Sequence, residues 1–152
     1  MLKIRRAHHS DRDELAKLLA SLWADATAAE HGRDLEEILA SGTYGTLPMA
    51  ILVSEDENGA LTGFIEVGLR SHADGCDAKR AVGFIEGWFV VERVRNRGVG
   101  RELMRAAEDW ARAQGCVELA SDALIDNELS LSAHEAMGFE VVDRCVHFKK
   151  AL

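Results

Sequence analysis

The chain has 152 residues, 47% of them apolar and only one a proline, which is enough for one folded domain with a substantial core. Its formal net charge of −8 argues against a general nucleic-acid binder and favours a cationic partner. No apolar run approaches the roughly 20 residues of a membrane span, and the start of the chain lacks the apolar stretch of a signal peptide. The three widely spaced cysteines suit reduced thiols and form no metal motif, so we expect a single cytoplasmic domain over residues 1–152.

The first half of the chain predicts a strand, two helices and a strand hairpin. Residues 2–6 alternate as a short strand does, and Ser10 precedes a helix whose leucines share one face. Residues 25–32 predict a loop, and residues 33–40 predict a second helix that ends at Gly42. Residues 49–54 and 61–69 predict antiparallel strands, because a Glu57-Asn58-Gly59 turn signal lies between them.

The second half predicts strands that alternate with helices. Residues 71–80 predict a loop, 81–91 a central strand, 98–114 the main helix and 117–121 the next strand. A helix over 127–137 and a long final strand over 139–149 complete the order β-α-α-β-β-β-α-β-α-β. The strand-helix-strand unit predicts a right-handed crossover between parallel strands. The fold class is therefore α/β, with a mixed, mostly antiparallel sheet and helices on both of its faces.

A basic, glycine-containing loop separates the central strand from the main helix, with the sequence Arg95-Asn96-Arg97-Gly98-Val99-Gly100-Arg101. Glycines allow close approach of a ligand, and the free N–H groups at the start of a helix attract anions. A Walker loop is excluded because Arg101-Glu102 follows the glycines, and a dinucleotide fingerprint is excluded because Leu103 replaces its third glycine. The sequence predicts a phosphate or pyrophosphate site, with a solvated basic loop as the alternative.

The pattern Arg95-x-x-Gly98-x-Gly100, in this element order and with Gly138-Phe139 late in the chain, resembles the acetyl-coenzyme A signature of the GNAT superfamily of N-acetyltransferases. Residues 84–90, 119–122 and 132–139, together with Gly75-Cys76-Asp77, are similar to bacterial aminoglycoside 6′-N-acetyltransferases. The resemblance implies a homodimer that uses acetyl-coenzyme A to acetylate a primary amine of a polycationic sugar, by direct transfer.

The resemblance also implies which residues hold the coenzyme. The pantetheine arm of the coenzyme would pair with the end of the central strand as another strand does. The residues implied lie at this strand end, in the glycine-containing loop and before the last helix: Phe89, Val90, Val91, Arg95, Arg97, Gly98, Val99, Gly100, Arg101 and Asn127. His134 stands where many GNAT enzymes carry a tyrosine that protonates the leaving thiolate, so we expect it to be either that acid or a structural histidine. Many GNAT chains end in two strands and this one is expected to end in one, which is compatible with strand exchange in a dimer.

Three carboxylates and two tryptophans are candidates for the acceptor side. Glu86 lies within an apolar strand, where a lone charge is costly, so it either pairs structurally or faces a cleft to bind an amine and accept its proton. Asp122 follows the end of the next strand, where α/β sheets place ligands, and Glu66 is a weaker candidate for substrate contact. Trp23 and Trp88 could form the walls of a sugar pocket or pack in the core.

Other functions remain open from the sequence. A GNAT enzyme could instead modify a protein lysine, an N-terminal amine or a small polyamine. A coenzyme A-binding module without turnover is a further alternative. The acceptor profile separates the enzymes, and the release of free thiol separates enzyme from binding module.

Overall fold

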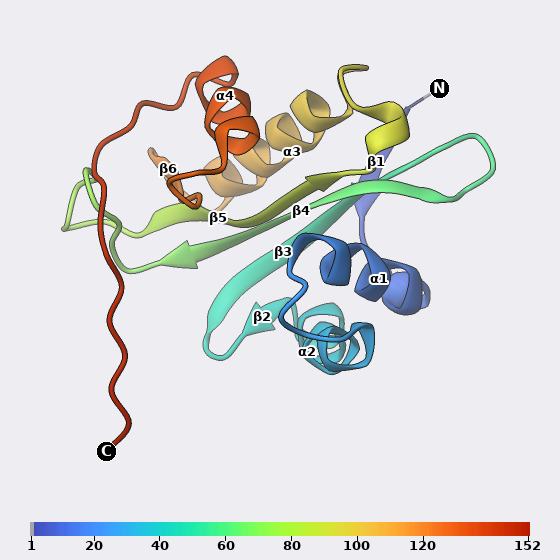
Figure 1. The fold of residues 1–152 in the computed structure, drawn as a ribbon, viewed down its shortest axis with the longest axis horizontal. Helices are drawn as coiled ribbons and strands as arrows, with labels where there is room; N and C mark the ends of the chain where they lie inside the picture. The colour runs from blue at the N-terminus through green and yellow to red at the C-terminus, as the bar shows by residue number, and fades with distance from the viewer. Residues whose placement is uncertain (1) are drawn as a thin grey trace.

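A computed structural model describes residues 2–152 and shows one twisted sheet between two layers of helices (Figure 1). The strands lie in the order β1-β3-β4-β5-β6, and the two-residue strand β2 pairs with β3. All neighbouring strands are antiparallel except β5 and β6, which are parallel. The strands are β1 (Lys3–Arg6), β2 (Thr43–Tyr44), β3 (Leu47–Glu55), β4 (Leu61–Arg70), β5 (Val82–Val90) and β6 (Leu119–Ser121). The predicted mixed, mostly antiparallel sheet is thus confirmed.

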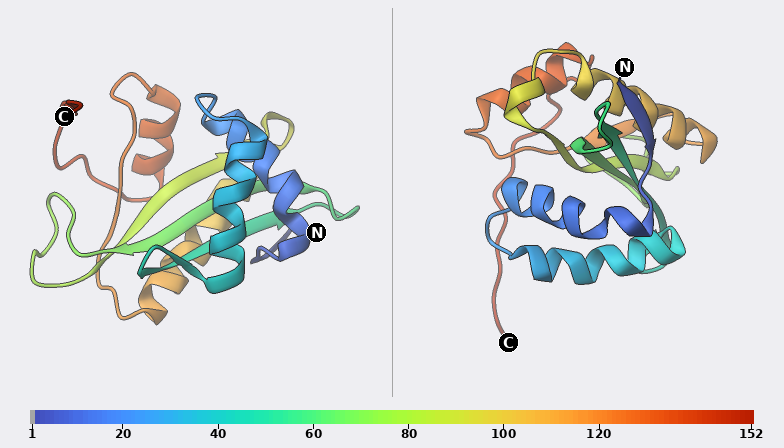
Figure 2. Two further views of the ribbon diagram at one scale, coloured as in Figure 1. Left: turned by 90° about the horizontal axis from the view of Figure 1, so that it is seen from below. Right: turned by 90° about the vertical axis from the view of Figure 1, so that its right-hand side faces the viewer.

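Each face of the sheet carries its own apolar core. Helices α1 (Arg12–Leu22) and α2 (Ala28–Ser41) cover one face, and α3 (Val99–Ala113) and α4 (Glu128–Ala136) lie on the other (Figure 2). On the first face, Leu15 and Leu35 pack against Phe64, and on the second face Leu103 and Met104 pack against Ile65. The side chains of β4 alternate between these cores, which explains why this strand is buried on both sides. Two short 3-10 turns, His9–Asp11 and Glu92–Val94, precede α1 and α3.

Helix α2 begins earlier than the sequence predicts. Thr27 accepts a hydrogen bond from the backbone N–H of Glu30, and the Glu30 carboxylate accepts one from the backbone N–H of Thr27. This reciprocal capping box starts the helix at Ala28, so the prediction of a loop as far as residue 32 is wrong. The longer helix brings His31 and Asp34 into the wall of a pocket.

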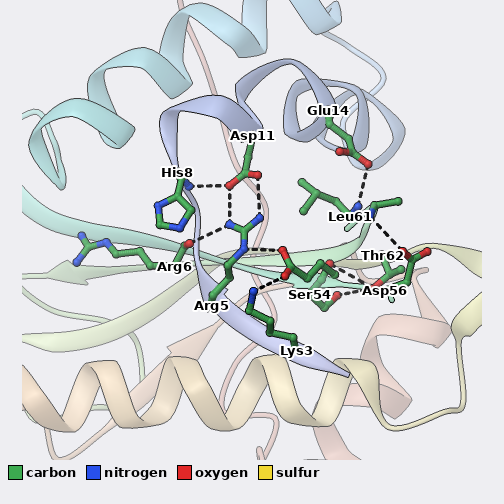
Figure 3. Close-up of polar contacts among 12 residues, drawn as sticks. Lys3, Arg5, Arg6, His8, Asp11, Glu14, Ser54, Asp56, Leu61 and Thr62 are labelled. Carbon is green, nitrogen blue, oxygen red and sulfur yellow. Dashed lines mark hydrogen bonds and ion pairs between the residues drawn. The ribbon is translucent and has the colours of Figure 1, made fainter. Parts of the chain in front are cut away.

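A network of ion pairs fixes the N-terminal strand to the first helix (Figure 3). The Arg5 guanidinium donates to both carboxylate oxygens of Asp11, at 2.7 and 2.9 Å, and to Glu55 at 2.6 Å. Nearby, Glu14 accepts a hydrogen bond from the backbone N–H of Leu61 at 2.8 Å, which ties α1 to the start of β4. Charged hydrogen bonds of this kind are short and orient both partners.

The predicted final strand over residues 139–149 is wrong for this chain in isolation. Phe139 still packs against the core on the α3 side, and residues 140–152 then run away from the body of the molecule with no strand assignment, past the 71–80 loop (Figure 1). Val142 packs over Gly75, where an added Cβ would lie 2.7 Å from it, and the apolar side chains beyond it are exposed. The segment has the alternation of a strand but pairs with no strand of residues 2–152, and that pairing is what a strand requires.

Candidate active site

A pocket of about 610 Å³ opens between the two N-terminal helices and the strands β4 and β5. Its charged and titratable lining consists of four carboxylates, one guanidinium, one imidazole and one phenol: Asp25, Asp34, Glu66, Glu86, Arg70, His31 and Tyr44. Leu35, Ile38 and Met49 supply part of its apolar wall. A cleft with an excess of carboxylates attracts a cationic ligand.

A β-bulge brings Glu86 to this pocket. Glu66 pairs with Gly87 and Val67 pairs with Ile85, so Glu86 is the extra residue of β5. A bulge bends the strand and redirects the side chains next to it. The Glu86 carboxylate is about one-third exposed and receives two hydrogen bonds from Arg70, at 2.9 and 2.8 Å. The sequence predicts that Glu86 either forms a structural ion pair or faces a cleft. In the structure it does both, because it pairs with Arg70 and lines the pocket.

Glu66 lies deeper in the same pocket. Its side chain comes from the middle of β4, the residue is only 7% exposed, and the Oε2 atom lies 3.3 Å from where a Cβ on Gly87 would be. No hydrogen bond or ion pair to Glu66 is present within residues 2–152. Burial, and then the charges of Glu86 and Asp34, raise the pKa of Glu66 to about 7.

The two tryptophans lie on opposite faces of the sheet. Trp23 lines the acidic pocket, where its ring edge would be 2.5 Å from a Cβ on Gly87, so the bare Gly87 is what admits it. Trp88, expected as a second wall, instead packs with the α3 core, against Gly100 and the ring of His134. The bulge at Glu86 explains this position. The one extra residue moves every later side chain of β5 to the opposite face of the sheet, Trp88 included.

Asp122 is exposed just beyond the end of β6. Its charge acts on Arg70 and, after that of Glu86, contributes to raising the pKa of this guanidinium. Asp122 and Glu86 therefore approach the same cation from neighbouring strands.

Strands β5 and β6 separate immediately before Glu86 and Asp122. Their pairing ends at Ile85 and Ser121, so residues 86–90 of β5 have no strand partner on that edge within residues 2–152. An unpaired strand edge offers alternating N–H and C=O groups to an extended ligand. At its far end the edge is closed, because Arg95 donates to the carbonyl of Val90 at 2.9 Å and sits over the ring of Phe89. The Val91 N–H donates to the carbonyl of Thr62 on β4, so it lies on the opposite side of the strand and is not part of this edge.

The glycine loop follows at the N-terminus of α3. Asn96 and Gly98 both have positive φ, at 60° and 85°, and the helix begins at Val99 with no side-chain cap. Nothing lies within 4 Å of a Cβ added to Gly98, whereas a Cβ on Gly100 would meet Trp88 at 3.2 Å. Arg97 and Arg101 are exposed and have no ion pair in the described part of the chain, while Arg95 is used within the loop. Open helix N–H groups beside two free cations fit a pyrophosphate.

An unsatisfied polar atom lies beneath this loop. The indole Nε1 of Trp88 is buried and has no hydrogen-bond partner among residues 2–152. It is 3.5 Å from the position of a Cβ on Gly100, at the junction of the strand edge and the helix start. Buried N–H groups are normally paired, so this donor is a fit for an acceptor oxygen of a bound ligand.

His134 is held by its neighbours on both ring nitrogens. Its Nδ1 lies 2.7 Å from the carbonyl oxygen of Ser130, so Nδ1 must carry a proton and donate it. Its Nε2 lies 2.7 Å from the hydroxyl of Ser121, and the ring packs edge-on to Trp88 and Phe139. In the neutral ring, Nε2 accepts from Ser121 and has no proton to give. Asn127 caps α4, since its side-chain oxygen accepts from the N–H of Ser130 at 3.0 Å.

Three residues of this region are absent from the sequence-based candidates: Arg70, Asp34 and Ser121. Arg70 ends the strand that pairs with β5, but its contact with Glu86 depends on a bulge that no local pattern reveals. Asp34 lies within the predicted helix over residues 33–40, but its place in the pocket depends on how α2 packs against the sheet. Ser121 precedes Asp122 directly, and its position at a strand end was the one available signal.

Comparisons with known proteins agree with this geometry. The model of the acetyltransferase (GNAT) family matches residues 14–139. An aminoglycoside N(6′)-acetyltransferase type 1 from Klebsiella aerogenes is 39% identical over 149 residues, covering 98% of this chain and 96% of that protein. The structure of AAC(6′)-Iy with the bisubstrate analogue CoA-S-monomethyl-acetylneamine has a TM-score of 0.89 at 31% identity, covering 100% of this chain and 99% of that one. AAC(6′)-Ih from Acinetobacter baumannii has a TM-score of 0.88 at 26% identity, with the same coverage.

None of the helices in residues 2–152 is long and apolar enough to cross a membrane. The family model spans most of the chain, and the Klebsiella relative aligns with it almost from end to end. The chain belongs to the GNAT family of acetyltransferases.

Proposed function

We propose that this protein transfers an acetyl group from acetyl-coenzyme A to a primary amine of a polycationic acceptor, the 6′-amine of an aminoglycoside. The observation that carries the proposal is an acidic pocket at one side of a parted strand edge, with an anion-binding helix start at the other end of that edge. The relatives named for this reaction support the choice of acceptor.

The coenzyme and the acceptor are proposed to bind to different groups of residues, and the first group holds the coenzyme. The N-terminus of α3, with Arg97 and Arg101, is proposed to hold the phosphates of the coenzyme, and the β5 edge to align its pantetheine arm. Val90 is proposed to contribute its backbone to this edge, although Arg95 already occupies its carbonyl, whereas the N–H of Val91, the next expected contact, is used by Thr62 of β4. The Trp88 indole is proposed to donate to the coenzyme. When bound, acetyl-coenzyme A supplies an activated thioester.

The acceptor side is proposed to use charge and a flat apolar surface. Glu86 and Asp122 bind ammonium groups of the acceptor, and the Trp23 ring packs on its sugar C–H groups. Glu86 can do so only by exchanging Arg70 for the substrate cation. His134, expected as the acid or as a structural histidine, is proposed to orient the Ser121 hydroxyl at the point where the strands part, because its two ring nitrogens lie 2.7 Å from the Ser130 carbonyl and from that hydroxyl.

A thiol-release assay tests the proposed function. Acceptors would be aminoglycosides with and without a free 6′-amine, spermidine and a lysine peptide. Thiol release with the 6′-amino compounds alone is the expected result. Release with the lysine peptide or spermidine at equal rate would assign the enzyme to protein or polyamine acetylation, and no release with any amine would leave a coenzyme-binding module.

We also propose that the protein is a cytoplasmic homodimer in which the segment 139–152 packs on a second copy. Val142, Val146 and Phe148 occupy alternate positions of this segment and are 64%, 76% and 93% exposed, although Val142 also packs over Gly75. Strand β6 is the end of the sheet and has one unpaired edge, which an extended segment from a second copy could pair with. Cys76, Cys116 and Cys145 are free thiols, as a reducing compartment requires.

Light scattering after gel filtration tests this assembly. The unmodified chain is expected to elute as a dimer, and a Val146→Asp, Phe148→Asp variant as a monomer with an unchanged circular-dichroism spectrum. A Val117→Asp variant is the control, because Val117 is 67% exposed but lies outside the segment. A dimer that persists in the double variant would show that the segment does not hold it.

A further inference from the structure

The floor of the acidic pocket holds two carboxyl groups in different states. Glu86 is ion-paired and one-third exposed, whereas Glu66 is unpaired and almost fully buried. We propose that Glu66, rather than Glu86, takes the proton from the ammonium group of the acceptor. This inference rests on the proposed acetylation of an amine, and it assigns the base for that reaction.

Glu86 is poorly suited to be the base while Arg70 is in place. The guanidinium donates to both of its oxygens, and protonation of Glu86 would leave this cation without its partner. Exchange of Arg70 for a substrate ammonium leaves Glu86 facing a new cation, so its role is to bind a positive charge in either case. A group that binds ammonium as a counter-ion holds the proton on nitrogen rather than removing it.

Glu66 has the position and surroundings of a proton acceptor. Its carboxyl lies beneath the bulge, beside the bare Gly87 and within the pocket, and no residue among 2–152 neutralises it. The charged groups that line the same pocket are Glu86 on β5, Arg70 on β4, Asp34 and His31 on α2, and Asp25 before α2. The nearby carboxylates and the burial disfavour the ionised form of Glu66, and its pKa of about 7 suits a base that works near neutral pH.

The proton and electron balance is as follows. An acceptor ammonium gives one proton to the Glu66 carboxylate, which leaves a neutral amine and a carboxylic acid. The amine lone pair forms a bond to the acetyl carbon as the carbon–sulfur bond breaks, and the surplus nitrogen proton goes to the departing sulfur. The products are an amide and a thiol, and Glu66 returns its proton to water through the open pocket.

A pair of isosteric variants tests the assignment. In the wild type, kcat/KM for one aminoglycoside is expected to fall as the pH drops through about 7, since Glu66 must be ionised. Glu66→Gln is expected to lose this limb and to lower kcat by about 10²–10⁴-fold with little change in either KM. Glu86→Gln is expected to keep the limb and to raise the acceptor KM. Glu135→Gln, at an exposed position of α4, controls for the loss of a charge.

Two results would overturn the proposal. One is a folded Glu66→Gln variant that retains the wild-type kcat and acid limb. The other, which needs no turnover, is carboxyl ¹³C NMR of the wild type in which the signal missing from Glu66→Gln titrates with an ordinary glutamate pKa of about 4.3. Failure of the proposed function is a separate result, because it appears as a wild type that acetylates no 6′-amine while the NMR titration still reports on Glu66.

Discussion

The Arg70 guanidinium spans both carboxylate oxygens of Glu86 on the floor of the acidic pocket, at 2.9 and 2.8 Å, and lies 3.5 Å from the centre of the Phe84 ring. An internal cation thus occupies the carboxylate to which we propose that a substrate ammonium binds. This pairing keeps the pocket closer to neutral when it is empty. Under the proposed function, acceptor binding would then exchange one cation on Glu86 for another.

Arg70→Gln is expected to lower the acceptor KM, because the substrate no longer competes with an internal cation and the pocket becomes more negative. Steady-state kinetics at low and high salt would measure it, and the gain should fade as salt rises. Arg80→Gln is the control, since Arg80 is exposed and its contact with Asp77 is 3.8 Å long. An increased acceptor KM in Arg70→Gln would show instead that Arg70 orients Glu86.

Gly98→Ala is expected to weaken acetyl-coenzyme A binding. At φ 85° a Cβ costs about 1 kcal/mol, and the loop would shift its N–H groups to relieve the strain. Gly115→Ala is a matched control, because Gly115 has the same φ of 85° and equally open surroundings at the other end of the helix. Both variants should lose similar stability, but calorimetry should show reduced coenzyme affinity for Gly98→Ala alone. Equal affinities in the two variants would contradict the phosphate role of the loop.

The order of elements was predictable because it depends on local signals, whereas the site depends on contacts between strands. The start of α2 also has a local signal, because Thr27 and Glu30 have the spacing of a capping box, and this signal contradicts the predicted loop over residues 25–32. The bulge at Glu86 has no local signature, so the sequence could not place Trp88 on the α3 face or pair Arg70 with Glu86. The prediction of a final strand was wrong for a different reason, since residues 139–149 have the pattern of a strand but no partner strand among residues 2–152.

Asp11→Asn is expected to destabilise the fold at neutral pH and to weaken its dependence on acid. The Arg5 guanidinium lowers the pKa of Asp11, so Asp11 contributes stability above its unfolded pKa, and the contribution is lost as the pH falls through its lowered folded pKa. Charged hydrogen bonds of this kind contribute about 1.5–3 kcal/mol each at most. Urea unfolding at pH 7 and pH 3 would measure the difference. The gap between wild type and variant should narrow at pH 3, and a gap that widens would contradict the assignment.

Asp122→Asn is expected to raise the acceptor KM about tenfold while kcat stays near the wild-type value. Asp122 lies past the end of β6 and acts on the same Arg70 that Glu86 binds, but it does not line the pocket, so we expect it to meet the acceptor further out than Glu86 does. Loss of one charged contact that forms equally in the ground and transition states appears in KM, and a tenfold change corresponds to about 1.4 kcal/mol. Asp126→Asn is the control, because Asp126 is also exposed in the same connection. Loss of turnover in Asp122→Asn at saturating acceptor would contradict this prediction. It would place Asp122 at the reacting nitrogen and make Asp122 a candidate for the base instead of Glu66.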